Sequence, residues 1–534
     1  MGIPSYFSYI IRNYPKIVKN LKFHKKNQND FHHLFMDSNS IIYDAIKDIK
    51  PDEYNFEQLL IEKVIQNIEN YIQQIKPSKT IFIAFDGVAP FAKMNQQKTR
   101  RYKSAFMANL RFIDNKVNTN TNSWSTSNIT PGTNFMKKLS NSVRKAFLNT
   151  EQKYKVNKVI VSGSDENGEG EHKIFEYIRN NPFYEENMIL YGLDSDLIML
   201  SLFHSHCYKN GYIFREAPEF IKSSIPLPDS DKNTNEPYVL DISLLADSIM
   251  LEMNCKYKDR KRIYDYVFLC FMLGNDFLPH FPALNIRTHG IPVLLGFYTD
   301  IIGNYSDRFF ISDDNKIQWK YFKMFIHELA KREHEFIIQE YVVRDKKQKR
   351  NYKTDTVENR EQVLNQIPTI YRSEELYICP SHNMWEERYY KSLFDLDRDH
   401  DNVQKICNNY LEALEWVFKY YSSGCSDWRW TYEYHYPPLL VDLYKYIPNS
   451  ESKFILNRRS AFTENVQLSY VLPPSNFNLL PEHVSSKLLK EYSNLFSDKL
   501  EFQWAFCSYF WESHVCFKNV PLETLEKWEA DFVF

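Results

Sequence analysis

The chain has 534 residues, 43% of them hydrophobic, and a formal net charge of -2 at pH 7. Because a single hydrophobic core rarely grows beyond about 250–300 residues, we expect two domains. The balanced charge excludes a uniformly basic nucleic-acid binder, although it can conceal an acidic cluster beside a basic groove.

The sequence predicts a protein that works inside the cell and away from membranes. Its apolar runs are far shorter than the roughly 20 residues that span a bilayer, and its first residues lack the pattern of a signal peptide. Eight cysteines occur without a C-x-x-C pair, which argues against a zinc ribbon and fits a reducing compartment. We expect the cytoplasm, with the nucleus as the alternative. Frequent Asn, Lys, Ile and Tyr suit an AT-rich genome, such as that of a large DNA virus.

The first 300 residues alternate short apolar runs with stretches of helical period, which is typical of an α/β fold with a parallel sheet. An amphipathic helix is predicted over 56–75 from the spacing of its apolar residues. The expected strands are His33–Met36, Ile81–Phe85, Lys158–Val161 and Met188–Leu193.

Polar and charged stretches divide the chain. Residues 114–130 and 226–237 are rich in turn-forming and small polar residues, so we expect loops there. The charged stretch 344–361 predicts solvated chain between two domains. Beyond it, 405–421 and 482–496 have helical spacing. The predicted division is an α/β domain over 1–310, a charged linker or peripheral segment over 311–365 and a mostly helical region over 366–534.

Three predicted strands run directly into an acid, namely Asp37, Asp86 and Asp194. Parallel strands share one carboxyl edge, so these side chains should converge there. Four further acids belong to the set: Asp196 lies two residues after Asp194, Glu169 and Glu171 come after another predicted strand, and Asp276 follows an apolar run. An acid after a strand can also simply cap the next helix, but the repetition of the pattern favours a shared site.

A cluster of carboxylates needs compensation, because like charges raise one another's pKa. Oxygen ligands without cysteine favour Mg²⁺ or Mn²⁺, and two such ions suit phosphodiester cleavage. Glu169 and Glu171 are two residues apart and would diverge on a helix, so both can join only if Glu169 lies at or before the helix start.

A helix beginning near Pro90 is predicted to carry a basic face. Lys93, Gln97, Arg100 and Arg101 follow at i, i+4, i+7 and i+8, with no acid until Asp114. Guanidinium forks and an ammonium suit a terminal phosphate. The alternative is an ordinary solvated face, and the nearby Asp86 favours phosphate binding over it.

An aromatic segment over 424–438 alternates like a strand or an extended loop. Flat rings can stack on bases of any sequence, as a non-specific nuclease requires. Core packing is the competing interpretation for most of these rings. One stacking ring, Trp428 or Trp430, would suffice.

Longer motifs recur along residues 1–481: MGIPSYF, DSNSIIY, FDGVAPFAKMNQQKTRRY, ITPGTNFM, GEGEHKIFEYI, YGLDSDLIMLSL, FMLGNDFLPHFP, WEERYYKSLF, YHYPPLLVDL and VLPPSNFNLLP. Together they resemble the Xrn family of 5′→3′ exoribonucleases. The resemblance implies a flap-endonuclease-like or PIN-like α/β catalytic domain with a helical second region. It also implies processive, magnesium-dependent degradation of single-stranded 5′-monophosphate RNA to mononucleotides in RNA decay. We expect a monomer, and the sequence does not identify protein partners.

The resemblance assigns roles to individual residues. The implied metal-site acids are Asp37, Asp86, Glu169, Glu171, Asp194, Asp196 and Asp276. The implied 5′-phosphate pocket is Lys93, Gln97, Arg100 and Arg101. The family stacks the first bases between a histidine and a tryptophan; the histidine position is Tyr43 here, which keeps a ring without the imidazole. The resemblance weakens over 504–521, and we expect a short form without the long C-terminal extensions.

Two alternatives remain open from the sequence. A 5′→3′ DNA exonuclease or flap endonuclease would share the acids but normally carries a helix-hairpin-helix element, which the sequence does not show. A non-catalytic RNA-binding module would not need the complete set of acids.

Overall fold

The computed structural model describes residues 2–22, 30–50, 54–115, 124–192, 194–215, 237–496 and 499–532. Within these ranges no helix combines the length and the apolar character needed to cross a bilayer. The predicted loop over 226–237 lies outside them except for Pro237, and so does part of the loop predicted over 114–130.

A seven-stranded sheet lies in the N-terminal half, with the strand order β1-β7-β6-β5-β2-β3-β4. The five strands from β6 to β4 run parallel, whereas β7 and β1 are antiparallel at one edge. The α/β prediction and its four strands are confirmed. The strand bounds are β1 (Val18–Asn20), β2 (His33–Asp37), β3 (Thr80–Ala84), β4 (Lys158–Ser162), β5 (Phe183–Tyr191), β6 (Tyr208–Arg215) and β7 (Tyr238–Asp241).

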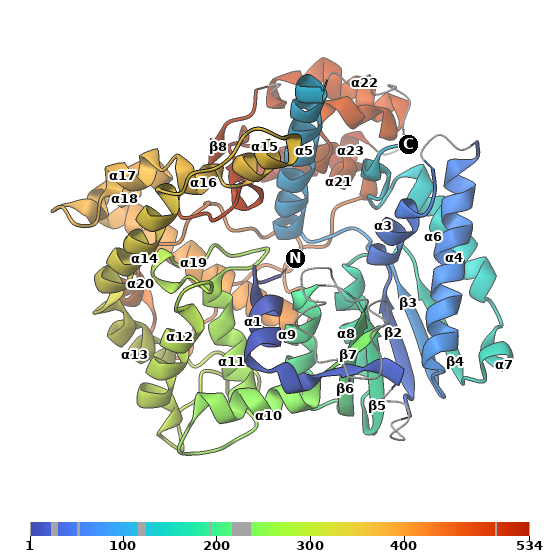
Figure 1. The fold of residues 1–534 in the computed structure, drawn as a ribbon, viewed down its shortest axis with the longest axis horizontal. Helices are drawn as coiled ribbons and strands as arrows, with labels where there is room; N and C mark the ends of the chain where they lie inside the picture. Colours follow the sequence, from blue (N-terminus) through green and yellow to red (C-terminus); the bar gives the residue numbers. More distant parts are fainter. Residues whose placement is uncertain are drawn as a thin grey trace.

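Both faces of the sheet are covered by helices, which is why its central strands are apolar on both sides. Leu34 and Met36 of β2 pack on one face, and Phe35 packs on the other. In Figure 1 the strands lie between α4 and α6 on one side and α8 and α9 on the other. The helices of this half are α1 (Tyr6–Asn13), α3 (Asn39–Lys47), α4 (Phe56–Ile75), α5 (Phe91–Asn115), α6 (Asn134–Phe147), α7 (Glu151–Tyr154), α8 (Gly170–Asn180), α9 (Ser195–Phe203) and α10 (Ile242–Met253).

The chain after α10 is mostly helical, so the helical part begins well before residue 366, where the predicted helical region starts. Its helices are α11 (Arg262–Cys270), α12 (Gly290–Tyr298), α13 (Trp319–Ala330), α14 (Glu333–Gln348), α15 (Val357–Asn365), α16 (Ile367–Ile370), α17 (Ser373–Ile378), α18 (Trp385–Phe394), α19 (His400–Ser422), α20 (Leu440–Tyr446), α21 (Glu464–Val471), α22 (Glu482–Glu491) and α23 (Leu522–Asp531). A two-stranded sheet joins β8 (Phe502–Gln503) to β9 (His514–Val515).

Helix α5 stands away from the sheet and connects the two halves. Figure 1 shows it upright, between the C-terminal helices α21–α23 and α15. Its first turn packs through Phe91 and Met94 against a cluster that includes Val466 of α21 and Trp528 of α23. Helix α5 extends to Asn115, so the first two residues of the loop predicted over 114–130 are helical.

Most of the segment predicted over 311–365 as a charged linker or peripheral segment is helical and not irregular chain. Helices α13, α14 and α15 occupy 319–330, 333–348 and 357–365. Arg344 is fully buried and its Nη2 lies 2.5 Å from Oε1 of Glu375, which Arg372 also contacts at 2.5 Å. A run of mixed charges predicts solvent exposure from local composition alone, and it does not reveal a partner carboxylate 31 residues away.

We predict that Glu375→Ala lowers the free energy of unfolding by about 3–5 kcal/mol, because two buried guanidinium groups lose their shared carboxylate. Urea denaturation followed by circular dichroism measures this change. The matched control is Glu335→Ala, which removes an exposed pair with Arg332 and should leave the free energy of unfolding close to that of the wild type. Equal destabilisation by both substitutions would contradict the prediction.

Candidate active site

The predicted acids gather at the carboxyl edge of the parallel strands. Asp37 ends β2, Asp86 follows β3 by two residues, and Asp194 is the N-cap of α9 with Asp196 in its first turn. The chain runs from β2 to β3 and β4 on one side and then crosses to β5 on the other. The acids thus surround the position where the strand order reverses, which is where open α/β sheets bind ligands.

Asp37, Asp86 and Glu171 form one group whose carboxylate oxygens lie within 4.8 Å of one another, and Glu169, Glu171 and His172 form a second group within the same distance. Glu169 is the N-cap of α8, so the condition that both glutamates can join the site is met. Two backbone bonds, Gly87 N to Gly168 O and Gly168 N to Val88 O, both 2.8 Å, hold the two acid-bearing loops together. The backbone of α8 adds a third bond, from Gly170 N to Asp86 Oδ1 at 2.7 Å.

Lys93 of α5 joins the remaining acids to this group. Its Nζ lies 2.7 Å from Oδ2 of Asp276 and also pairs with Glu169. Both the lysine and the two carboxylates are almost fully buried. We call the seven acids together the acid centre: Asp37, Asp86, Glu169, Glu171, Asp194, Asp196 and Asp276.

The acid centre carries more negative charge than its buried cation balances. Burial, and then the neighbouring acids, raise the pKa of Asp37 and Glu171 well above their usual values. Burial alone would lower the pKa of Lys93, but Asp276, Glu169 and Glu171 raise it well above its usual value. Burial raises the pKa of Asp196 to about 6. Further positive charge at this edge would therefore stabilise the ionised carboxylates.

The geometry fits a hard divalent cation. Oδ1 of Asp37 is buried without a hydrogen-bond partner, although carboxylate oxygens normally find one. A Cβ on Gly170 would lie 2.7 Å from the same atom, so only glycine leaves this oxygen its space. Oxygen donors from Asp37, Asp86 and Glu171 match the preference of Mg²⁺ and Mn²⁺.

The predicted basic residues of α5 are not all placed alike. Gln97 is buried, and its Oε1 has no hydrogen-bond partner. Arg101 donates from Nε and Nη2 to Oγ1 of Thr130, at 3.2 and 2.7 Å. Arg100 is exposed and lies at the wall of a large cavity. Lys93 is buried and paired with acids. The four residues therefore differ in exposure and do not form one uniform basic face.

The aromatic residues separate into one core ring and two rings that remain accessible. Trp430 is buried and stacks on Trp416, with ring centroids 5.3 Å apart. Trp428 is half-buried, and its Cη2 would lie 3.8 Å from a Cβ on Gly168, next to Glu169. Tyr43 on α3 is 41% exposed. The geometry therefore favours Trp428 over Trp430 as the ring beside the acid centre.

Sequence reasoning missed three polar residues that hold the acids. Tyr420 and Tyr421 of α19 donate to Glu169 at 2.8 Å and to Asp196 at 2.5 Å. Asn39 donates from Nδ2 to Asp86 at 2.5 Å and accepts from the backbone N of Asp86 at 3.1 Å. The DSNS motif offered a signal for Asn39. The tyrosines offered none, because their partners lie more than 220 residues away.

Comparison with known proteins identifies a family whose models match this chain. Residues 1–217 match the family model described as XRN 5'-3' exonuclease N-terminus. Residues 256–376 and 381–502 match the model described as Xrn1 helical domain. The chain belongs to the Xrn family. The matches cover every strand of the large sheet except β7, and also α5, the acid centre and most of the helical region, so the family prediction is confirmed.

Relatives of the Xrn family align with nearly the whole chain. Human 5'-3' exoribonuclease 1 is 29% identical over 90% of this chain and 31% of its own length. 5'-3' exoribonuclease 1 of Saccharomyces cerevisiae is 26% identical over 90% of this chain and 40% of its own length. 5'-3' exoribonuclease 2 of Arabidopsis thaliana is 26% identical over 90% of this chain and 62% of its own length. The chain thus spans between 31% and 62% of the length of these relatives.

Among solved structures, the catalytic core of Rad2 in complex with DNA substrate shows only a weak likeness. One such structure has a TM-score of 0.29 at 14% identity and covers 56% of this chain and 70% of its own. A second has a TM-score of 0.30 at 12% identity and covers 81% of this chain and 91% of its own. At these scores we base no argument on them. The membership in the Xrn family rests on the sequence matches.

We predict that Gly170→Ala weakens Mn²⁺ binding by roughly 10- to 100-fold, the usual cost of displacing a group next to a metal ligand. The added Cβ would force the Asp37 carboxylate to turn away. Calorimetric titration with Mn²⁺ measures the affinity without any assay of turnover.

The control for this substitution is Gly296→Ala in α12, where a Cβ meets nothing within 4 Å. Its Mn²⁺ affinity should equal that of the wild type. Wild-type affinity in Gly170→Ala, with a normal melting temperature, would mean that the cation does not use Asp37.

Proposed function

We propose that the protein is a processive 5′→3′ exoribonuclease that degrades 5′-monophosphorylated RNA to mononucleotides in RNA decay. The observation that carries the proposal is the acid centre at the carboxyl edge of the sheet, directly beside the cations of α5. Membership in the Xrn family and the printed names of the relatives support it. We include in the proposal an intracellular monomer, placed first in the cytoplasm, that acts on single-stranded RNA.

The acids would hold two divalent cations, Mg²⁺ or Mn²⁺, through Asp37, Asp86, Glu169, Glu171, Asp194, Asp196 and Asp276. Such a pair of ions stabilises the attacking and leaving oxygens of phosphodiester hydrolysis. The chain's own contribution is to hold the carboxylates in place. Lys93 fixes Glu169 and Asp276, and the hydroxyls of Tyr420 and Tyr421 fix Glu169 and Asp196.

Lys93, Gln97, Arg100 and Arg101 of α5 would bind the 5′-phosphate of the RNA. A terminal phosphate offers more anionic oxygens than an internal one, so guanidinium groups can distinguish the two. Arg100 is exposed and free to turn toward such a group, while Arg101 is positioned by Thr130. Gln97 would contribute an amide donor, and Lys93 would link the phosphate pocket to the acid centre.

Tyr43 and Trp428 would hold the leading bases by stacking. Both rings keep accessible surface; Tyr43 lies on α3, and Trp428 lies beside Gly168. Stacking does not depend on base identity and is worth about 1–3 kcal/mol per base, so it allows the strand to advance without sequence preference.

A DNA exonuclease or flap endonuclease is the second candidate, since the acid centre would serve either nucleic acid. A non-catalytic RNA-binding module is disfavoured, because every acid expected for hydrolysis is in place. Parallel assays on RNA and DNA of one sequence, with and without divalent cation, separate the three.

The first test compares one RNA carrying a 5′-monophosphate, a 5′-triphosphate or a 5′-hydroxyl, labelled at its 3′ end. Wild type should degrade the monophosphate form fastest. Arg100→Ala and Arg101→Ala should each reduce that preference by about 10- to 150-fold, which corresponds to a charged hydrogen bond of about 1.5–3 kcal/mol.

The matched control is Lys98→Met on the same helix. Lys98 is buried over the rings of Tyr470 and Phe517, and burial lowers its pKa to about 8. Its loss should leave the end preference unchanged. If the arginine variants lose activity equally on all three RNA ends, α5 contacts the backbone and has no terminal pocket.

The second test concerns processivity. Tyr43→Ala and Trp428→Ala should leave intermediate-length RNA under single-encounter conditions, because each removes a stacking ring. Tyr43→His should preserve long runs. Trp430→Ala is the control for a core ring and should lower the melting temperature without shortening the runs. Unchanged product lengths in both accessible-ring variants would show that processivity has another origin.

A further inference from the structure

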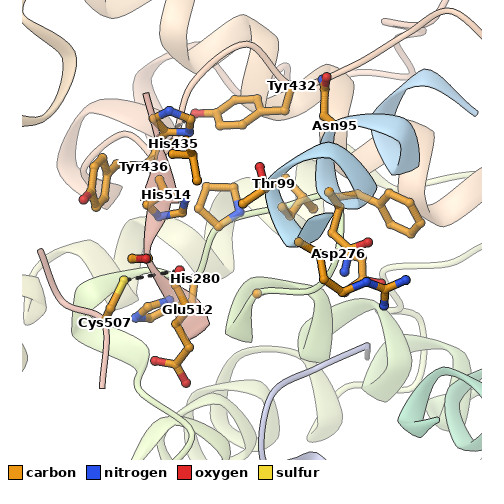
Figure 2. Close-up of a pocket in the computed structure, with 18 of the residues that line it drawn as sticks. Asn95, Thr99, Asp276, His280, Tyr432, His435, Tyr436, Cys507, Glu512 and His514 are labelled. Carbon is orange, nitrogen blue, oxygen red and sulfur yellow. Dashed lines mark hydrogen bonds between the residues drawn. The ribbon is translucent and has the colours of Figure 1, made fainter. Parts of the chain in front are cut away.

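A large cavity lies along α5 and extends away from the acid centre. Its volume is about 860 Å³, within the range of roughly 300–1,000 Å³ that is typical of small-ligand sites. Its walls come from α5, from the loop over 273–287, from the aromatic segment over 431–436 and from the chain over 505–520. In Figure 2, Thr99 and Asp276 stand on one side and His435 and His514 on the other. We call it the α5 cavity.

The α5 cavity reaches the acid centre at one point. Asp276 and Arg100 both line it, and so does Gly2, where a Cβ would collide with Asp196. The remaining acids and the two accessible rings, Tyr43 and Trp428, are absent from its walls. The acid centre therefore borders the cavity on one side and the expected base-stacking rings on another.

Helix α5 separates these two sides by its own periodicity. Lys93, Gln97 and Arg101 recur at four-residue intervals; Lys93 pairs with Asp276 of the acid centre, and Arg101 donates to Thr130. A second stripe on the same helix lines the cavity: Gln96, Thr99, Arg100, Lys103, Ser104 and Met107. Arg100 lies at the border of the two stripes.

The walls of the cavity suit an anion that is held only weakly. Basic and acidic side chains both line it, and several of them are already paired. Arg287 pairs with Glu512, and Lys103 donates to the backbone carbonyls of Trp511 and Ser513. His435 and His514 stack on each other, with ring centroids 4.8 Å apart. Flat rings and polar side chains of this kind can contact a nucleotide without binding it tightly.

We propose that the α5 cavity receives the nucleoside 5′-monophosphate after each cut and is the route by which this product leaves. This inference rests on the proposed function. A strand that enters past Tyr43 and Trp428 has its cleaved first nucleotide between the acid centre and α5, with the rest of the RNA behind it. The cavity begins at Arg100 and Asp276, at the border of the acid centre, and so offers the product a way forward.

The experiment narrows the cavity at a position remote from the acids. Ser104 is exposed at the cavity wall, so the ring in Ser104→Trp should enter the open space without displacing the core. Met107→Trp narrows the same space one turn further along. Asn109→Trp is the matched control, since Asn109 is exposed on α5 and does not line the cavity.

Each variant is mixed in excess with 5′-monophosphorylated oligoadenylate labelled at its 3′ end, and the reaction is quenched at successive times. In Ser104→Trp and Met107→Trp the first cut should keep its wild-type rate, because no product has been formed before it that would have to leave. Each later cut should be slowed at least about tenfold, as expected when product release limits turnover. RNA shortened by one nucleotide should therefore accumulate.

The outcomes are distinct. Successive rates equal to those of Asn109→Trp would overturn the exit route. Equal slowing of the first and later cuts, or weaker binding of uncut RNA, would mean that the strand itself occupies the cavity. If wild type fails to cut the monophosphorylated RNA, the proposed function is wrong. A melting temperature close to that of Asn109→Trp shows that a variant is folded. Either Ser104→Trp or Met107→Trp alone is enough to test the exit route.

Discussion

The mutual repulsion of seven buried or edge-placed carboxylates is the constraint on which the rest of the structure depends. Such a group of charges destabilises a fold unless cations and hydrogen-bond donors surround it. Lys93 supplies the cation from α5, and the hydroxyls of Tyr420 and Tyr421 supply donors from α19. These contacts come from three parts of the chain that are far apart in sequence. The two halves of the protein are therefore joined at the acid centre itself.

The sequence revealed the acids well, because each follows directly from local pattern. A buried strand that ends in an acid predicts both the strand and the place of the carboxylate, as at Asp37 and Asp86. The amphipathic helix over 56–75 was likewise found with its observed bounds. In contrast, nothing local indicated that Tyr421 would reach Asp196 or that Arg344 would be buried against Glu375. Those contacts depend on how distant helices pack.

Helix α5 shows a subtler limit of pattern reasoning. Its spacing placed Lys93, Gln97, Arg100 and Arg101 within one arc of the helix, and the arc is real. The arc is nevertheless wide enough to border two different spaces, one at the acid centre and one at the α5 cavity. Neighbouring residues on a helix diverge by about 100°. Only the packing of the loop around Asp276 and of the chain after 505 decides which residue faces which space.

One backbone contact links the beginning of α5 to the aromatic segment. The N–H of Phe91 donates to the carbonyl of Trp428 at 2.8 Å. Because this bond joins main-chain atoms, a change of side chain at either position leaves it intact. The backbone thus fixes how far the start of α5 lies from the ring at position 428. In the function proposed above, one flat side chain could replace another at position 428 while the distance between the 5′-phosphate contact and the base contact stays constant.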